Sequence, residues 1–306
     1  MWVFLYIINL IFAMLAAVPL SNLIQSKVGR SLAPERMLPD FDYTIYQDFM
    51  NAYGDEFSVI MGQSRLIFVF YFFLSLFLVG GILTILKNHA EKFNFQAFWS
   101  GCTVYFWRML RLTFYFLIIH MAIAGVFAAL VYYGWFKDGL EAVESEVDMF
   151  NAVKIILPIY LIFASFFFLI QDYAKIHVVH KNPNWLFRSF WKSFAIVFRN
   201  FLKTYPLYLL NVLTFVIIFG IFWYFRFSNN MDNMTNIALT FGIGQAFIFA
   251  RIGTKLLNLG SATLMYQSIM NEELEKEAIS LDEPIESSVQ ESESLMFLKP
   301  EGEEEE

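Results

Sequence analysis

The sequence has a single cysteine and lacks the short motifs of the common catalytic folds. Cys102 is the one cysteine among 306 residues, which excludes an internal disulfide and a metal site built from several thiolates. There is no Gly-rich phosphate loop, no dinucleotide-binding turn, no His-Glu-x-x-His motif and no serine nucleophile elbow. We therefore predict that the protein is not an enzyme and carries no cofactor.

Charge is also scarce, and it is unevenly distributed. Only 16% of the residues are charged, whereas 58% are hydrophobic and 19% are aromatic, a composition that excludes an ordinary soluble domain. The net charge of −7 comes from the C-terminal segment, because residues 272–306 hold 14 acids and two lysines. The rest of the chain is net basic. The composition predicts a basic membrane body followed by an acidic tail.

Six apolar runs are long enough to cross about 30 Å of hydrocarbon as helices. They cover approximately residues 2–20, 66–86, 112–136, 153–170, 206–225 and 237–265. The predicted fold class is therefore all-α, a polytopic integral membrane protein. The first run has an alternative interpretation as a cleaved signal peptide, since Ala16 and Ala17 lie near its end, although no basic segment precedes it.

A basic, aromatic stretch at 172–205 predicts the topology. It holds six lysines and arginines and one acid, Asp172, and such segments mark the cytoplasmic side of a membrane. The linker at 87–111 is also basic. We therefore expect both termini in the cytoplasm.

Each of these linkers is expected to contain an amphipathic helix in the membrane interface. Phe187, Phe190 and Trp191 recur at helical spacing in the second linker, with cations on another face. The candidates for binding anionic lipid headgroups are Arg108, Arg111, Lys175, Arg188, Lys192, Arg199 and Lys203. Lipid phosphates are a nearer partner for these cations than nucleic acid, so we expect no nucleic-acid binding.

The two linkers also match each other at an offset of 92 residues. Phe95, Phe98, Trp99, Phe106, Leu110 and Arg111 correspond to Phe187, Phe190, Trp191, Phe198, Leu202 and Lys203. This pattern predicts a parallel internal repeat with units at about 66–136 and 153–225. Chance matching in a chain with 37 phenylalanines is the alternative.

Polar residues inside the apolar runs are the candidate functional residues. Arg251 and Lys255 lie in the sixth run, and an intramembrane charge marks a functional site unless it snorkels to the interface. The candidates are Asp172, Arg251, His120, Asn211 and Gln245, together with Asn9. An Asp172–Arg251 ion pair is one hypothesis. The uncharged groups either form interhelical hydrogen bonds or line a polar cavity.

Four further features of the sequence concern helix packing, partners and metals. The loop at 21–65 contains a predicted surface helix after an N-cap at Asp40 or Asp42, and the Gly80-Gly81 pair predicts a close helix crossing or a kink. The tail at 272–306 is predicted to be disordered, with a short apolar island at 294–300. Either segment is a candidate contact for a protein partner. His177 and His180 near Asp172 could hold a metal, but two imidazoles and a carboxylate at a membrane interface are more often ordinary interface residues, so we predict no metal site.

Several short motifs resemble uncharacterised six-span bacterial membrane proteins, which are similar to the membrane domain attached to some glycerophosphodiester phosphodiesterases. The matching residues are Phe98-Trp99 with Arg108 and Arg111, the run from Asp172 to Ile176, and Gln245 with Arg251. The resemblance implies a bacterial inner-membrane protein of undetermined role. It does not imply phosphodiesterase activity, since no segment here could form that catalytic barrel.

Two functions remain as hypotheses. The first is a structural or accessory membrane protein that binds anionic lipid and a protein partner. The second is a transporter of a small molecule or lipid, with a polar cavity near Arg251. Whether the intramembrane polar side chains converge on one pocket distinguishes them.

Overall fold

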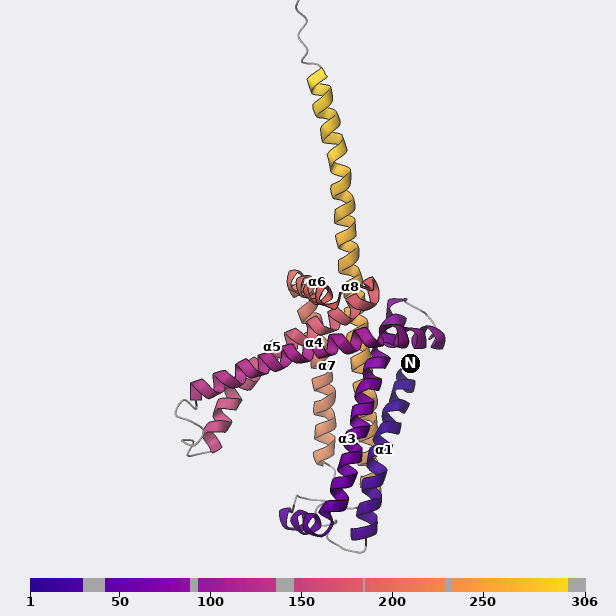
Figure 1. The fold of residues 1–306 in the computed structure, drawn as a ribbon, viewed down its shortest axis with the longest axis vertical. Helices are drawn as coiled ribbons and strands as arrows, with labels where there is room; N and C mark the ends of the chain where they lie inside the picture. Colours follow the sequence, from indigo (N-terminus) through magenta and orange to yellow (C-terminus); the bar gives the residue numbers. More distant parts are fainter. Residues whose placement is uncertain (30–41, 89–92, 136–145, 184, 229–232, 297–306) are drawn as a thin grey trace, which may run out of the picture. The chain divides into compact units, whose positions relative to one another are not determined.

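The computed structural model describes residues 1–29, 42–88, 93–135, 146–183, 185–228 and 233–296. Within these ranges the chain forms helices and no strand (Figure 1). The helices are α1 (Trp2–Val28), α3 (Tyr43–Lys87), α4 (Phe95–Trp135), α5 (Glu146–Lys181), α6 (Leu186–Arg199), α7 (Phe201–Ser228) and α8 (Met234–Met296). All but α6 contain a stretch long and apolar enough to cross a membrane. The predicted fold class is confirmed, and the chain is an integral membrane protein.

The chain divides into two units, Met1–Thr263 and Leu264–Glu306. The first unit contains the packed helices and both cavities described below. In the second unit α8 continues as a helix to Met296, whereas we expected disorder from Glu272. Glutamate and lysine favour the helix intrinsically, so a helix already formed in the preceding turns can propagate through this sequence. Residues 297–306, with most of the apolar island, lie outside the described residues.

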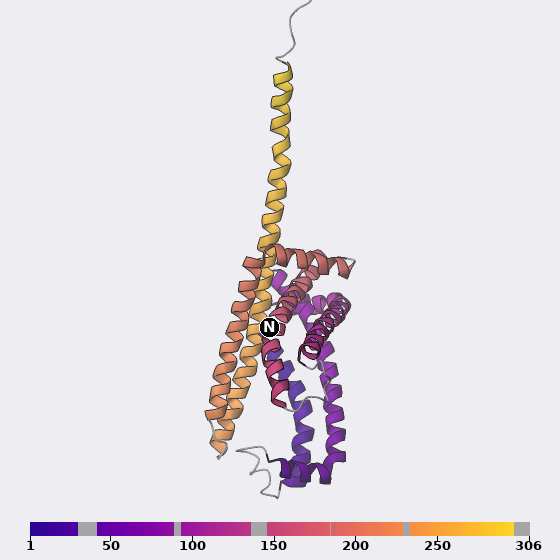
Figure 2. The same ribbon diagram turned by 90° about the vertical axis from the view of Figure 1, so that its left-hand side faces the viewer.

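Helices α1 and α3 lie side by side (Figures 1 and 2). Asp42 is the N-cap of α3, and its carboxylate accepts hydrogen bonds from the backbone N–H groups of Thr44 and Ile45. The predicted surface helix and second span are one helix, with its first part drawn at an angle to the rest (Figure 1). The connection at 21–65 is therefore shorter than predicted, since α1 continues to Val28 and α3 begins at Tyr43.

The buried core of the first unit lies where α3 crosses α4. A Cβ added at Gly80 would lie 2.8 Å from the Gly101 carbonyl oxygen, and one added at Gly81 would lie 2.6 Å from that of Phe98. Small residues thus let the two backbones approach closely. Phe98 and Cys102 of α4 are buried at this crossing, and farther along α4 the side chains of Met109, Leu112 and Phe116 are buried as well. The predicted close crossing at Gly80-Gly81 is confirmed.

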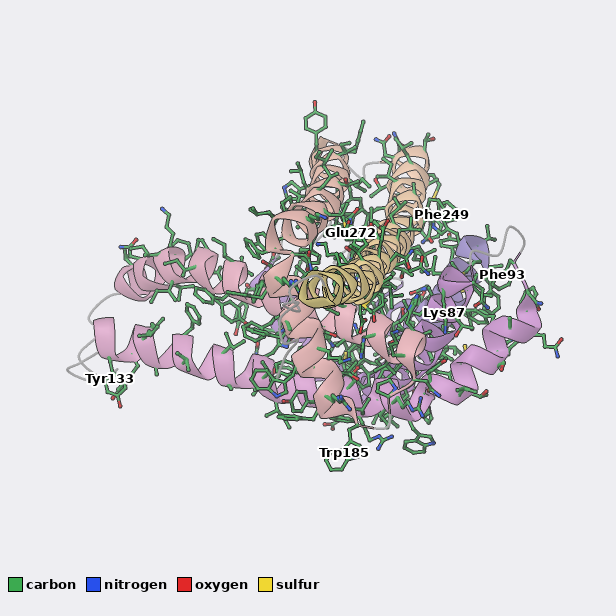
Figure 3. All side chains as sticks on the ribbon, turned by 90° about the horizontal axis from the view of Figure 1, so that it is seen from above. Lys87, Phe93, Tyr133, Trp185, Phe249 and Glu272 are labelled. Carbon is green, nitrogen blue, oxygen red and sulfur yellow. The ribbon has the colours of Figure 1, made fainter. Side chains whose placement is uncertain are left out.

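The two predicted interfacial helices differ. The first is not a separate helix, because α4 runs unbroken through residues 95–111 into the third span. The second is separate, since α6 ends at a C-cap on Asn200. Its buried face is formed by Ser189, Phe190, Ser193, Ile196 and Val197, whereas most of its aromatic side chains are exposed. Figure 3 shows Trp185, just before α6, pointing away from the helices.

The remaining spans complete the unit. The C-terminal half of α5 is buried, and Lys87 of α3 donates hydrogen bonds to the Val179 and His180 carbonyl oxygens at 3.1 and 3.4 Å. A cation at the carbonyl end of a helix is favourable. Helices α7 and α8 run side by side (Figure 2), with the rings of Phe222 and Phe247 stacked at 4.4 Å. The connection at 136–145 lies outside the described residues.

Candidate anion-binding cavity beside α8

Two cations on α8 border a cavity of about 380 Å³. Arg251 and Lys255 are four residues apart, so they project from one face of the helix. The lining residues are Leu5, Ile8, Asn9, Phe68, Tyr71, Ser75, Leu78, Val79, Ile82, Ile248, Arg251, Ile252, Lys255, Leu256 and Leu259. Mostly apolar walls with a few polar groups are typical of sites for small ligands.

The uncharged polar groups of the cavity bond to one another or to the backbone. The Tyr71 hydroxyl donates to Oδ1 of Asn9. Nδ2 of Asn9 donates to the Leu5 carbonyl at 2.7 Å, and the Ser75 hydroxyl donates to the Phe72 carbonyl at 2.8 Å. These groups are therefore held in place before any ligand binds.

The two cations differ from these groups. In the part of the chain that the structure describes, the ion pairs are Lys27–Glu56 and Lys175–Asp172, and neither Arg251 nor Lys255 has a side-chain hydrogen bond. The hypothesised Asp172–Arg251 pair is wrong for this structure. Asp172 bonds instead to Asn258, which lies about two helical turns beyond Arg251 on α8.

The first helix contacts α8 beside the cations. The Trp2 indole donates to the Phe249 carbonyl at 2.8 Å and stacks on the Phe249 ring, while the Tyr6 hydroxyl donates to Oε1 of Gln245 at 2.9 Å. Arg251 therefore lies close to the first turn of α1, and residues of α1, α3 and α8 line the cavity together.

A second cavity, of about 230 Å³, shares Arg251 and Lys255 with the first. Its other lining residues are Tyr208, Asn211, Val212, Phe215, Thr254 and Asn258. The two cations thus border both hollows.

A hydrogen-bonded chain joins α5, α7 and α8 beside the second cavity. Asn211 donates through Nδ2 to Ser261 Oγ at 2.9 Å and to Asn258 Oδ1 at 3.3 Å. Asn258 donates to Asp172 Oδ2 at 3.1 Å, and Lys175 donates to Asp172 Oδ1 at 3.0 Å. Both carboxylate oxygens of Asp172 are therefore engaged.

The predicted polar residues converge only in part. Asn9, Asn211 and Arg251 line cavities, whereas Gln245 forms the interhelical bond to Tyr6. His120 lies elsewhere, with Nδ1 at 2.7 Å from the Phe116 carbonyl oxygen and its ring 4.3 Å from that of Phe168. The cavity interpretation and the hydrogen-bond interpretation each describe some of these residues.

The predicted headgroup candidates are also dispersed. Arg111, Arg188, Lys192, Arg199 and Lys203 are exposed, whereas Arg108 is partly buried and Lys175 is paired with Asp172. His177 is buried, and Nδ1 of His180 contacts the Ile176 carbonyl. Across the described ranges no group of three or more His, Cys, Asp or Glu side chains could hold a metal ion.

Sequence reasoning missed Tyr71, Asn258 and Ser261. Asn258 had a usable signal, because it follows Lys255 by one helical turn and so extends the polar stripe of α8. Tyr71 had none, since aromatic residues are common throughout this chain.

No protein-family model, curated protein or solved structure matches this chain. The resemblance described from the sequence therefore stays a prediction.

Proposed function

We propose that this protein binds an anionic lipid in the cavity beside Arg251 and Lys255. It would act without catalysis, as a structural or accessory protein of a bacterial inner membrane with both termini in the cytoplasm. One observation carries the proposal: two cations without a partner in the described chain line a mostly apolar cavity.

Both cations are exposed on the surface of the protein, beside mostly apolar walls. In a membrane interface such a cation needs an opposite charge or hydrogen-bond acceptors, and a lipid phosphate or carboxylate supplies both. The walls formed by Leu5, Leu78 and Ile82 would gain by covering an acyl chain. Because Lys175 already compensates Asp172, the local charge favours an anionic headgroup over a zwitterionic one.

The test is native mass spectrometry of the protein purified in a mild, uncharged detergent. We expect wild type to retain anionic lipid in a defined ratio and the Arg251→Gln, Lys255→Gln double variant to lose it. The matched control is Arg226→Gln with Lys154→Gln, which removes the same charge from exposed positions outside both cavities. Equal lipid retention by the two double variants would refute the site.

The protein partner is the second part of the proposal. The acidic residues from Glu272 onward offer a charged segment to a basic partner. Deleting 272–306 should remove a stoichiometric partner that co-purifies with wild type. If the same proteins co-purify with both forms, this segment is not the contact.

Transport of an anionic lipid is the second candidate function, and one observation favours it. Arg251 and Lys255 border two cavities, so an anion could move from one to the other while still in contact with the same cations. Vesicles reconstituted with the protein should then exchange a fluorescent anionic lipid between leaflets faster than vesicles containing the double variant. Equal rates of lipid exchange with wild type and with the double variant would rule out transport and leave lipid binding as the proposed function.

A further inference from the structure

Three side chains form a polar stripe along α8. Arg251, Lys255 and Asn258 are separated by four and three residues, so they are neighbours on one face of the helix. Asn258 and Lys255 line the same second cavity. A group that hydrogen-bonds to the Asn258 side chain therefore lies about one helical turn from Lys255.

Asp172 is such a group. Its Oδ2 lies 3.1 Å from Asn258 Nδ2, and its Oδ1 lies 3.0 Å from Lys175 Nζ. Asp172 is also within electrostatic range of Lys255. A carboxylate released from Asn258 would be an internal anion competing with a lipid headgroup for the same cations.

The orientation of Asn258 is itself fixed. Asn211 donates to its Oδ1 at 3.3 Å, which directs the NH₂ end of the Asn258 carboxamide toward Asp172. The Ser261 hydroxyl accepts the other bond of Asn211 and donates to the Asn258 carbonyl at 3.1 Å. The Asn211 bond therefore orients the carboxamide as a donor to the carboxylate, whereas the Ser261 bond goes to the backbone of Asn258.

We propose that Asn258 is a positioning residue: it holds the Asp172 carboxylate away from Lys255 and Arg251, and so keeps these cations available to an anionic ligand. This inference rests on the proposed function. It assigns to the α5–α7–α8 network an effect on ligand affinity in addition to its effect on stability.

The experiment is a titration of phosphatidylglycerol into the full-length protein in uncharged detergent, followed by native mass spectrometry. The Asn258→Ala variant should bind roughly tenfold more weakly, the effect of about one hydrogen bond to a charged group. Adding Asp172→Asn to that variant removes the competing charge and should restore most of the affinity. The Asn151→Ala variant, at an exposed amide of α5, is the control and should bind as wild type does.

Stability provides the readout that separates positioning from a purely structural role. Thermal unfolding of Asn258→Ala should occur at a lower temperature, and Asp172→Asn should not reverse that change, because it also removes the ion pair with Lys175. Recovery of binding without recovery of stability supports the proposal. Binding by the double variant that is as weak as that of Asn258→Ala overturns it.

If Asn258→Ala does not fold, the Asn211→Leu variant can be tested in its place. Asn211→Leu leaves Asn258 in place but removes the bond that orients its carboxamide, so it should weaken binding less, with the same rescue by Asp172→Asn. Binding unaffected by Asn211→Leu would also count against the proposal. Failure of wild type to bind phosphatidylglycerol would overturn the proposed function itself, a result distinct from binding without rescue.

Discussion

Residues 95–111 and 187–203 carry the same pattern of aromatic and basic side chains but occupy different structures. At the start of the two stretches, corresponding positions have similar exposure. Phe98 and Phe190 are 0% and 8% exposed, whereas Trp99 and Trp191 are 42% and 54% exposed. Farther along the exposure differs, because Phe198 and Leu202 are exposed whereas Phe106 and Leu110 are partly buried. The first stretch lies within the continuous helix α4, and the second is divided between α6 and α7. The shared pattern therefore accounts for burial only near its start, and it does not determine whether the helix continues.

Local helix breakers explain the difference. Asn200 is the C-cap of α6, and its carbonyl accepts hydrogen bonds from the N–H groups of Lys203 and Thr204 at the start of α7. Pro206 is the sixth residue of α7, so the Leu202 carbonyl lacks the backbone N–H that would otherwise bond to it and the start of α7 is weakened. The corresponding residues in the first stretch, Arg108 and Phe114, are ordinary helix residues. A capping asparagine and a nearby proline thus turn one copy of the pattern away from its span.

The two regions are also held by different contacts. The first packs its backbone closely on α3 through glycine residues. The second packs through its rings, with Phe190 on Phe116 of α4 and Phe194 on Phe166 of α5, and α5 in turn bonds to α8 through Asp172 and Asn258. Interhelical packing in membranes uses both means, and the following variants test each one by its effect on the free energy of unfolding in detergent.

The largest loss of stability is expected from a substitution at the glycine crossing between α3 and α4. In Gly81→Ala the new methyl would lie 2.6 Å from the Phe98 carbonyl oxygen, so the helices must separate, at a cost of about 3 kcal/mol. Gly220→Ala is the control, because nothing lies within 4 Å of its new methyl. Alanine there should stabilise the helix by about 0.5–1 kcal/mol. Effects of the same sign would show that the crossing is not close-packed.

The second largest loss of stability is expected when the polar contacts of α5 are removed. Asp172→Ala removes the ion pair to Lys175 and the hydrogen bond from Asn258, and we expect a loss of about 2 kcal/mol. Glu56→Ala removes the exposed pair with Lys27 and should change stability little, since solvent screens that pair. Equal losses for the two variants would contradict the importance of the network around Asp172.

The paired tryptophans compare the two copies directly. Trp99 contacts the rings of Phe4 in α1 and Phe77 in α3, whereas the ring contacts recorded for Trp191 in the described chain come from α6 itself. Trp99→Ala should therefore destabilise more than Trp191→Ala, by about 1 kcal/mol. A larger loss from Trp191→Ala would mean that α6 is held more tightly than the structure indicates.

The smallest effect is expected at the contact between α3 and α5. Lys87→Met removes the hydrogen bonds to the Val179 and His180 carbonyls, with an expected loss of about 0.5 kcal/mol. Amide hydrogen exchange near the end of α5 should increase locally. Lys154→Met, near the other end of α5, is the control. If amide exchange at the end of α5 is unchanged in Lys87→Met, then Lys87 does not stabilise the end of this helix.

The sequence predicted the fold better than the site. Hydrophobic runs indicate spans because each helix must satisfy its own backbone in lipid, and the Gly80-Gly81 pair indicated where two helices approach. Arg251 was identified because a charge in an apolar run is conspicuous. The Tyr71–Asn9 and Asn258–Asp172 bonds could not be predicted, because they depend on the register between helices far apart in the sequence. That register is set by packing, which no local pattern contains.

The contact between Trp2 and Phe249 has a consequence for biosynthesis. The two residues are 247 positions apart, and at ~5–20 residues per second a ribosome needs roughly 12–50 s to make the intervening chain. During that time α1 has no α8 to receive its indole and tyrosine hydroxyl. Helix α1 must therefore remain in the bilayer without this contact until α8 has been made, and the cavity that both helices line can form only after that.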